Sequence, residues 1–212
     1  MPQIPEGLMK VSVTSEEYQV LKDMNERRLY LSREISSLGY EEAPNDYLSS
    51  VGQMVKFIMD CNREDADIPV EERKPIKLYI NSPGGDVCEG FALISAIELS
   101  KTPVYTINIG QWSSMSFYIG ITGHKRFSLP NMTFLLHDGS TGAFGSANKV
   151  QDRVDFDKRF ERDVIKKHVL SHGKMSEREY DAQVRVEYYM LPVDALELGF
   201  IDEIVTDISS IL

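Results

Sequence analysis

Short segments rich in β-branched residues alternate with apolar helical segments after residue 76, and this alternation constrains the fold more than any other feature. Segments with strand character lie at 77–81, 103–110, 125–129 and 132–137. Segments with helical character lie at 87–101, 114–122 and 147–171. Strands joined through helices usually lie parallel in one sheet, because each helix carries the chain back to the start of the next strand. The sequence therefore predicts an α/β fold with crossover connections.

The N-terminal third of the chain is predicted to add fewer elements. Its expected elements are a helix at 17–26, a strand at 27–35, a polar loop at 36–47, a helix at 48–62 and a charged loop at 62–75. A chain of 212 residues suits one domain with a core of its own. We therefore expect a single domain at 27–212, preceded by an N-terminal arm at 1–26.

Capping residues mark the expected helix boundaries near the C-terminus. Ser176 and Glu179 have the spacing of a capping box, which predicts a helix that begins at this point. Pro192 suits the first position of a last helix, and Gly199 suits its end. A final strand is expected at 200–206.

Charge and cysteine content limit the classes of partner and compartment. The formal net charge of −10 repels phosphate backbones and anionic lipid surfaces, so neither nucleic acid nor membrane is an expected partner. The two cysteines, Cys61 and Cys88, form no C-x-x-C pair, and the N-terminus lacks the pattern of a secretory signal. These features favour a cytoplasmic protein.

Three segments, each following a strand, carry residues suited to a reacting centre. In 81–85, two glycines permit unusual backbone angles beside a helix N-terminus, although a tight turn needs the same residues. In 110–116 (GQWSSMS), a serine between strand and helix can present its hydroxyl beside free N–H groups, although helix capping is the simpler interpretation. In 134–139 (FLLHDG), a histidine that ends an apolar strand can act as a general base or be an ordinary strand-end residue.

A pair of histidines four residues apart lies near the end of the predicted helix at 147–171. His168 and His172 have the spacing of zinc ligands on one helix face, but the sequence offers no evident third ligand. Histidines at a helix C-terminus also interact favourably with the helix dipole. The dipole interpretation is therefore favoured, and no metal site is expected.

Taken together and in this order, the three segments resemble the proteolytic subunit of the Clp protease. The resemblance runs from about Arg27 to the C-terminus and is strongest over 78–130, which contains LYINSPGGDV, GQWSSMS and KRFSLPN. The segments TFLLHD and PVDALELGFIDEIV continue it. Several motifs in the family's order are much more specific than any one of them.

The resemblance implies a serine endopeptidase that hydrolyses unfolded polypeptides through an acyl-enzyme. Ser114 matches the family's nucleophile and His137 matches its general base. Gly85 and Met115 match the residues whose N–H groups form the oxyanion hole.

The third member of the catalytic triad departs from the family pattern. Glu187 aligns where the family has an aspartate, and Asp181 is the alternative if the alignment slips. A glutamate can orient a histidine, as it does on other folds. Further departures near the site are Asp86, Trp112, Ser116, Asp138 and Gly139. They predict a divergent member with an altered cleft or altered partner docking.

The resemblance also implies a fold and an assembly. The implied fold is the crotonase-like spiral of repeated β-β-α units, from which a helix at about 147–171 protrudes. Family members stack heptameric rings into a tetradecamer and receive substrates from an AAA+ unfoldase ATPase. ATP is used by that partner, so no cofactor is expected in this chain.

Two other functions stay open at this point. A non-catalytic ring subunit in a mixed assembly would explain the loss of the aspartate at Glu187. A coenzyme A enzyme of the crotonase superfamily would share an oxyanion site made of two N–H groups without needing a serine–histidine pair.

Overall fold

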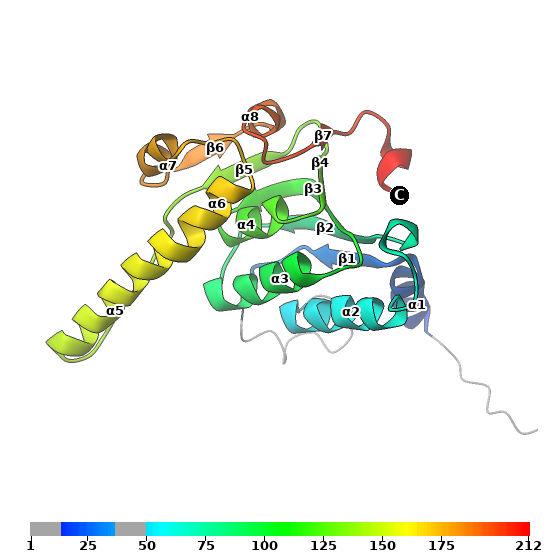
Figure 1. The fold of residues 1–212 in the computed structure, drawn as a ribbon, viewed down its shortest axis with the longest axis horizontal. Helices are drawn as coiled ribbons and strands as arrows, with labels where there is room; N and C mark the ends of the chain where they lie inside the picture. The colour runs from blue at the N-terminus through cyan, green and yellow to red at the C-terminus, as the bar shows by residue number, and fades with distance from the viewer. Residues whose placement is uncertain (1–13, 37–49) are drawn as a thin grey trace, which may run out of the picture.

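The computed structural model of the chain describes residues 14–36 and 50–212 (Figure 1). Of the arm predicted at 1–26 and the loop predicted at 36–47, residues 1–13 and 37–47 lie outside the described residues. The strands are β1 (Arg28–Leu31), β2 (Ile76–Ser82), β3 (Val104–Ser113), β4 (Lys125–Ser128), β5 (Thr133–Leu136), β6 (Tyr188–Met190) and β7 (Glu203–Ile204). The α-helices are α1 (Ser15–Glu26), α2 (Val51–Glu64), α3 (Val87–Leu99), α4 (Met115–Ile121), α5 (Ala147–Phe160), α6 (Lys166–Ser171), α7 (Glu177–Gln183) and α8 (Pro192–Glu197).

The described strands form one mostly parallel sheet, which confirms the predicted α/β class. The order is β1-β2-β3-β4-β7, and every neighbouring pair along this path is parallel. β5 pairs in parallel with β3 and in antiparallel orientation with β6. The short strand β6 was not predicted, because three residues are too few to reveal a period of two.

Strand β3 is longer than predicted and changes its partner along its length. Tyr105–Asn108 pairs with β4, whereas the last three residues, from Gln111, pair with β5. The strand was expected to end at Gly110, because the next residues are mostly polar. It continues to Ser113 because β5 supplies partners for its backbone, and this continuation sets the position of the chain that follows.

Helices α2, α3 and α4 pack side by side over one face of the sheet (Figure 1). The main core lies between them and the strands and includes Leu29, Met54, Ile80, Leu93 and Phe117. Asp86 caps α3, since its carboxylate accepts a hydrogen bond from the N–H of Glu89 at 2.9 Å. On the opposite face, a smaller apolar cluster of Tyr79, Ile107, Val205 and Ile211 anchors the C-terminal segment.

The charged segment predicted as a loop at 62–75 is tied to the core by a buried ion pair. Helix α2 runs on to Glu64, and Asp65 then receives two hydrogen bonds from the Arg27 guanidinium, at 2.6 and 2.7 Å. The hydroxyl of Thr102 donates a third, at 2.8 Å. The hydrogen bonds from Arg27 lower the pKa of Asp65, which is only 2% exposed. This carboxylate therefore stays ionised and joins α2 to the start of β1.

The predicted long helix at 147–171 is present but interrupted. A π-helical turn at Glu161–Ile165 separates α5 from α6. Figure 1 shows α5 extending away from the sheet, as the predicted protruding helix does. No helix among the described residues is long and apolar enough to cross a membrane.

The C-terminal capping signals hold, but the final strand was predicted too long. Ser176 and Glu179 form the predicted capping box, and Gly199 ends α8 with a φ of 71°. The N–H groups of Phe200 and Ile201 bond to the carbonyl of Ala195 at 2.8 and 3.4 Å. They close the helix instead of joining the sheet, so β7 retains only two residues.

Candidate active site

Ser114 stands in a strained turn between β3 and α4. Its φ of 56° and ψ of −125° are unusual for any residue except glycine, and such strain costs on the order of 1–3 kcal/mol. Its N–H donates to the carbonyl of Leu135 at 3.0 Å. Ser114 is half-buried between two buried neighbours, so the turn presents this residue while Ser113 and Met115 face inward. A strained strand-to-helix turn of this kind exposes a nucleophile.

The hydroxyl of Ser116 holds this turn in place. It accepts a hydrogen bond from the N–H of Ser113 at 2.8 Å and donates to the carbonyl of Ser82 at 2.6 Å. Ser116, which departs from the family pattern, is fully buried and forms hydrogen bonds to both β2 and β3, the strands that end at the site. Its polar atom is satisfied, so it adds rigidity at little cost.

Trp112, which was expected to alter the cleft, lies in the core instead. Its ring is 0% exposed, packs edge-to-face on Phe134 and covers Gly120. A side chain added at Gly120 would lie 2.3 Å from the indole, so the bulky tryptophan is matched by a glycine. The prediction of an altered cleft at this residue was wrong, because the sequence pattern did not show that it points inward.

The glycine pair after β2 lies directly against the Ser114 turn. A Cβ at Gly84 would lie 2.7 Å from the Ser114 Cβ and 2.8 Å from the Met115 nitrogen, and the φ of Gly84 is 97°. Only glycine therefore permits this approach. Gly85 has a φ of 138° and forms a parallel bridge with Ile35. The bridge uses the Gly84 carbonyl and the Asp86 N–H.

The N–H groups of Gly85 and Met115 belong to the two segments that meet where Gly84 contacts the Ser114 turn. Met115 is the first residue of α4, where the N–H has no acceptor within the helix. The N–H of Gly85 is outside the two hydrogen bonds of the bridge with Ile35. N–H groups in this setting suit a ligand atom that carries negative charge.

His137 follows β5, and the parallel pairing of β5 with the end of β3 brings His137 and Ser114 to the same edge of the sheet. Its Nδ1 lies 3.1 Å from Oε1 of Glu187, and its side chain is 22% exposed. Its carbonyl accepts a hydrogen bond from the Tyr118 hydroxyl at 2.9 Å. Burial raises the pKa of Tyr118, so this hydroxyl stays protonated and remains a donor.

The other ring nitrogen of His137 is buried and has no hydrogen-bond partner among the residues that the structure describes. Nε2 therefore makes no hydrogen bond with the hydroxyl of Ser114. Because Glu187 can only accept, the ring proton belongs on Nδ1, and Nε2 carries a free lone pair. The arrangement leaves a base with an unused lone pair, oriented by a carboxylate.

Glu187 lies just before β6, and the antiparallel pairing of β6 with β5 sets it opposite His137. Its side chain is 57% exposed, and the Tyr189 hydroxyl donates to its Oε2 at 3.2 Å. Asp181, the alternative, instead accepts from Nζ of Lys166 at 2.7 Å. The structure therefore places Glu187, and not Asp181, against the histidine.

Two tyrosines at the site were missed by the sequence analysis. Tyr118 lies four residues after Ser114 on α4, and Tyr189 follows Glu187 by two residues. Neither position carries a signal in a single sequence, because each contact depends on how distant segments meet. The other two histidines considered in the sequence analysis, His168 and His172, lie near Glu98 on α3. They take no part in the hydrogen bonds of His137.

A family comparison agrees with this geometry. The model of the family described as Clp protease matches residues 69–207, well over half of the chain. The matched span contains Gly85, Ser114, Met115, His137 and Glu187, together with the sheet from β2 to β7. The mostly parallel sheet and its covering helices are consistent with the crotonase-like fold of that family. The chain therefore belongs to the Clp protease family.

Proposed function

We propose that this chain is the proteolytic subunit of an ATP-dependent Clp protease, a serine-type endopeptidase that cleaves unfolded polypeptides. The observation that supports this most strongly is the strained Ser114 turn, held against Gly84 at the same edge of the sheet as a histidine whose Nδ1 faces a carboxylate. Acyl transfer needs a nucleophile, a base with a free lone pair and donors for a developing oxyanion. The described residues supply each of these groups.

In the proposed mechanism, Nε2 of His137 takes the hydroxyl proton of Ser114 while its oxygen bonds to the peptide carbonyl carbon. The carbonyl oxygen becomes negative and receives hydrogen bonds from the N–H groups of Gly85 and Met115. The histidine then gives its proton to the leaving amine, and the peptide bond breaks. Water, deprotonated by the same nitrogen, releases the acyl group and regenerates the serine.

Glu187 serves as the third member of the proposed triad. Its carboxylate fixes the proton of His137 on Nδ1 and stabilises the positive ring that forms during each proton transfer. Tyr189 holds the other carboxylate oxygen, and the hydrogen bond to Glu187 raises the pKa of the Tyr189 hydroxyl. This tyrosine is a positioning residue, because it acts on the histidine only through Glu187.

The proposed assembly follows from family membership. Chains associate into heptameric rings that stack as a tetradecamer, with the projecting helix α5 at the contact between rings. An AAA+ unfoldase supplies the ATP-dependent step and feeds polypeptides to the cytoplasmic chamber. Ring assembly then completes the hydrogen bond between Ser114 and Nε2 of His137, so the peptidase is active in the ring.

The unpaired Nε2 also favours a second candidate, a non-catalytic subunit in a mixed ring. The two functions differ in whether the purified ring hydrolyses peptides. The test is a fluorogenic peptidase assay on protein shown by size-exclusion chromatography to be assembled. The peptidase proposal predicts turnover that Ser114→Ala abolishes and that Ser113→Ala, a change at the neighbouring serine, largely retains. Assembled rings without turnover would favour the non-catalytic subunit.

A further inference from the structure

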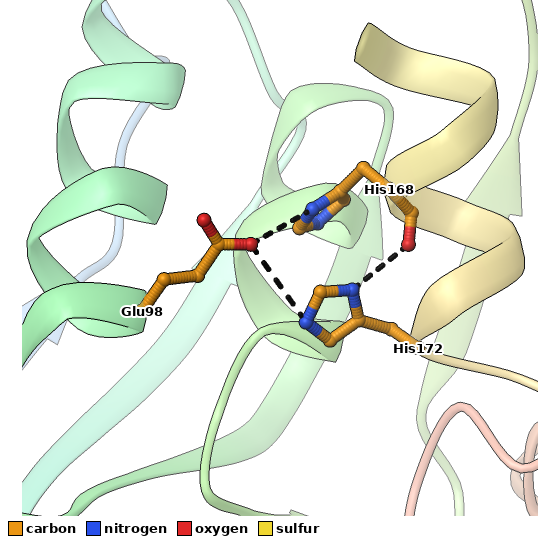
Figure 2. Close-up of side chains that lie close together, drawn as sticks. All are labelled: Glu98, His168 and His172. Atoms are coloured by element: carbon orange, nitrogen blue, oxygen red, sulfur yellow. Dashed lines mark hydrogen bonds and ion pairs between the residues drawn. The ribbon is translucent and has the colours of Figure 1, made fainter.

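Three potential ligands converge where α6 packs beside α3, and the proposed peptidase does not use them. Figure 2 shows Glu98 of α3 facing His168, at the third position of α6, and His172, just beyond its end. Oε1 of Glu98 lies 3.4 Å from Nδ1 of His168 and 3.9 Å from Nε2 of His172. All three ligand atoms lie within 4.8 Å of one another.

The hydrogen bonds of His168 fix which of its ring nitrogens carries the proton. Its Nε2 lies 3.0 Å from the carbonyl of Tyr118 and 3.2 Å from the hydroxyl oxygen of Thr122. That hydroxyl already donates its proton to the same carbonyl, at 2.8 Å, so it can only accept from the ring. Both neighbours of Nε2 are therefore acceptors, and Nε2 carries the proton. The lone pair of Nδ1 faces Glu98.

The same reasoning fixes the proton of His172. Its Nδ1 lies 2.8 Å from the carbonyl of His168 and 3.1 Å from the hydroxyl oxygen of Ser171. The Ser171 hydroxyl donates to that carbonyl at 2.9 Å, so it too must accept from the ring. Nδ1 of His172 carries the proton, and the lone pair of Nε2 faces Glu98.

Two imidazole lone pairs and one carboxylate oxygen therefore point at the same place. Acceptors repel one another unless a cation, either a proton or a metal ion, lies between them. We propose that Glu98, His168 and His172 form a binding site for a divalent transition metal of the zinc class. The two N–H···O=C bonds match the way metal-bound histidines are usually held by their second nitrogen.

The ligand set and its surroundings suit zinc chemistry. Two imidazoles and a carboxylate are ligands that zinc favours, and a tetrahedral site with metal–ligand distances of about 2.0–2.1 Å brings its donors to about 3.3 Å apart. Oε1 of Glu98 is already 3.4 Å from Nδ1 of His168, and its 3.9 Å separation from Nε2 of His172 shortens as the exposed Glu98 side chain moves toward a bound metal. Glu98 is 44% exposed, so a metal can enter from solvent.

The position of this site links it to the proposed catalytic residues. His168 bonds to the carbonyl of Tyr118, and the hydroxyl of Tyr118 bonds to the carbonyl of His137. The π-helical turn at Glu161–Ile165 lies just before the histidine pair, and such turns are frequent at functional sites. A bound metal would clamp α6 to α3 and hold α4, which begins beside Ser114. The metal is thus proposed to be structural, not catalytic.

The test is zinc binding to the full-length assembled protein after removal of metal with a chelator. Equilibrium dialysis against buffered Zn²⁺, followed by elemental analysis, gives the stoichiometry and the Kd. The wild-type protein should bind one Zn²⁺ per chain at this site. Glu98→Gln and His172→Gln should each weaken binding by at least about tenfold, since loss of even an outer-sphere partner costs that much. Both side chains are partly exposed, so these variants should fold.

Two controls identify where any zinc is bound. Glu89→Gln removes the same charge from the same helix and should bind zinc as the wild-type protein does. His137→Gln should also retain this zinc, because the catalytic histidine is not a ligand. Zn²⁺ at about 100 times the wild-type Kd should raise the Tm of the wild-type protein by about 5–10 °C and that of His172→Gln by no more than about half as much. Absence of zinc binding, or zinc lost with His137→Gln and retained with His172→Gln, would overturn the proposal.

Discussion

Glu187→Gln tests the third member of the proposed triad, because it removes the charge while keeping the size of the side chain. The attraction between two unit charges about 4 Å apart is about 1 kcal/mol in water and about 4 kcal/mol near a protein surface. Glu187 is 57% exposed and the His137 side chain is 22% exposed, so we expect an intermediate value of about 2 kcal/mol. This energy corresponds to about a 30-fold loss of kcat.

The effect should fall on kcat and not on KM, because the histidine becomes positive only during proton transfer. The assay is steady-state hydrolysis of a fluorogenic peptide by assembled protein, with Glu197→Gln as a control of equal charge at an exposed position of α8. A buried carboxylate in a serine protease triad is worth about 10⁴-fold. A loss below threefold would exclude Glu187 from the triad. A loss near 10⁴-fold would show that the solvent exposure of Glu187 does not weaken its effect on His137, contrary to our estimate.

Three other perturbations have expected outcomes. Gly84→Ala should lower kcat/KM about 100-fold, because its Cβ would lie 2.8 Å from the Met115 nitrogen and displace that donor; near-normal turnover would contradict this. Asp65→Asn should destabilise the fold by about 3 kcal/mol at neutral pH by leaving Arg27 unpaired. Because Arg27 lowers the folded pKa of Asp65 below its ordinary value of 3.8, this stability is present above that pH and is lost as the pH falls through the folded value. The difference in Tm between wild type and variant should therefore narrow between about pH 5 and pH 2, and a constant difference would refute the account. Iodoacetamide at neutral pH should alkylate exposed Cys88 and spare Cys61, whose pKa burial raises to about 11; equal labelling by mass spectrometry would show that Cys61 is accessible.

The parallel part of the fold could be predicted because its signals are local. Each strand from β2 to β5 has its own β-branched or apolar run, and glycine or proline marks the ends of several of them. Ser114 and His137 could be proposed for the same reason, since each follows a strand. That the two lie at the same edge of the sheet depends on the parallel pairing of β3 and β5.

The rest of the site depends on contacts between distant segments. Glu187 could be proposed only by alignment, because the strand that positions it, β6, is three residues long. The hydrogen bond from Tyr118 to His137 joins two elements that no pattern relates. Glu98 was missed as a partner of the histidine pair because it comes from α3, a separate helix far from α6 in the sequence. The π-helical turn before α6 likewise has no residue signature.

Covalent labelling of Ser114 tests the central claim most directly. The assembled protein would be treated with a fluorophosphonate probe, and the adduct would be mapped by mass spectrometry beside Ser114→Ala. The proposed peptidase predicts one adduct, at Ser114, that is absent from the variant, because only a serine activated by a base reacts readily. Assembled rings that acquire no adduct at Ser114 would contradict the account and indicate a non-catalytic subunit.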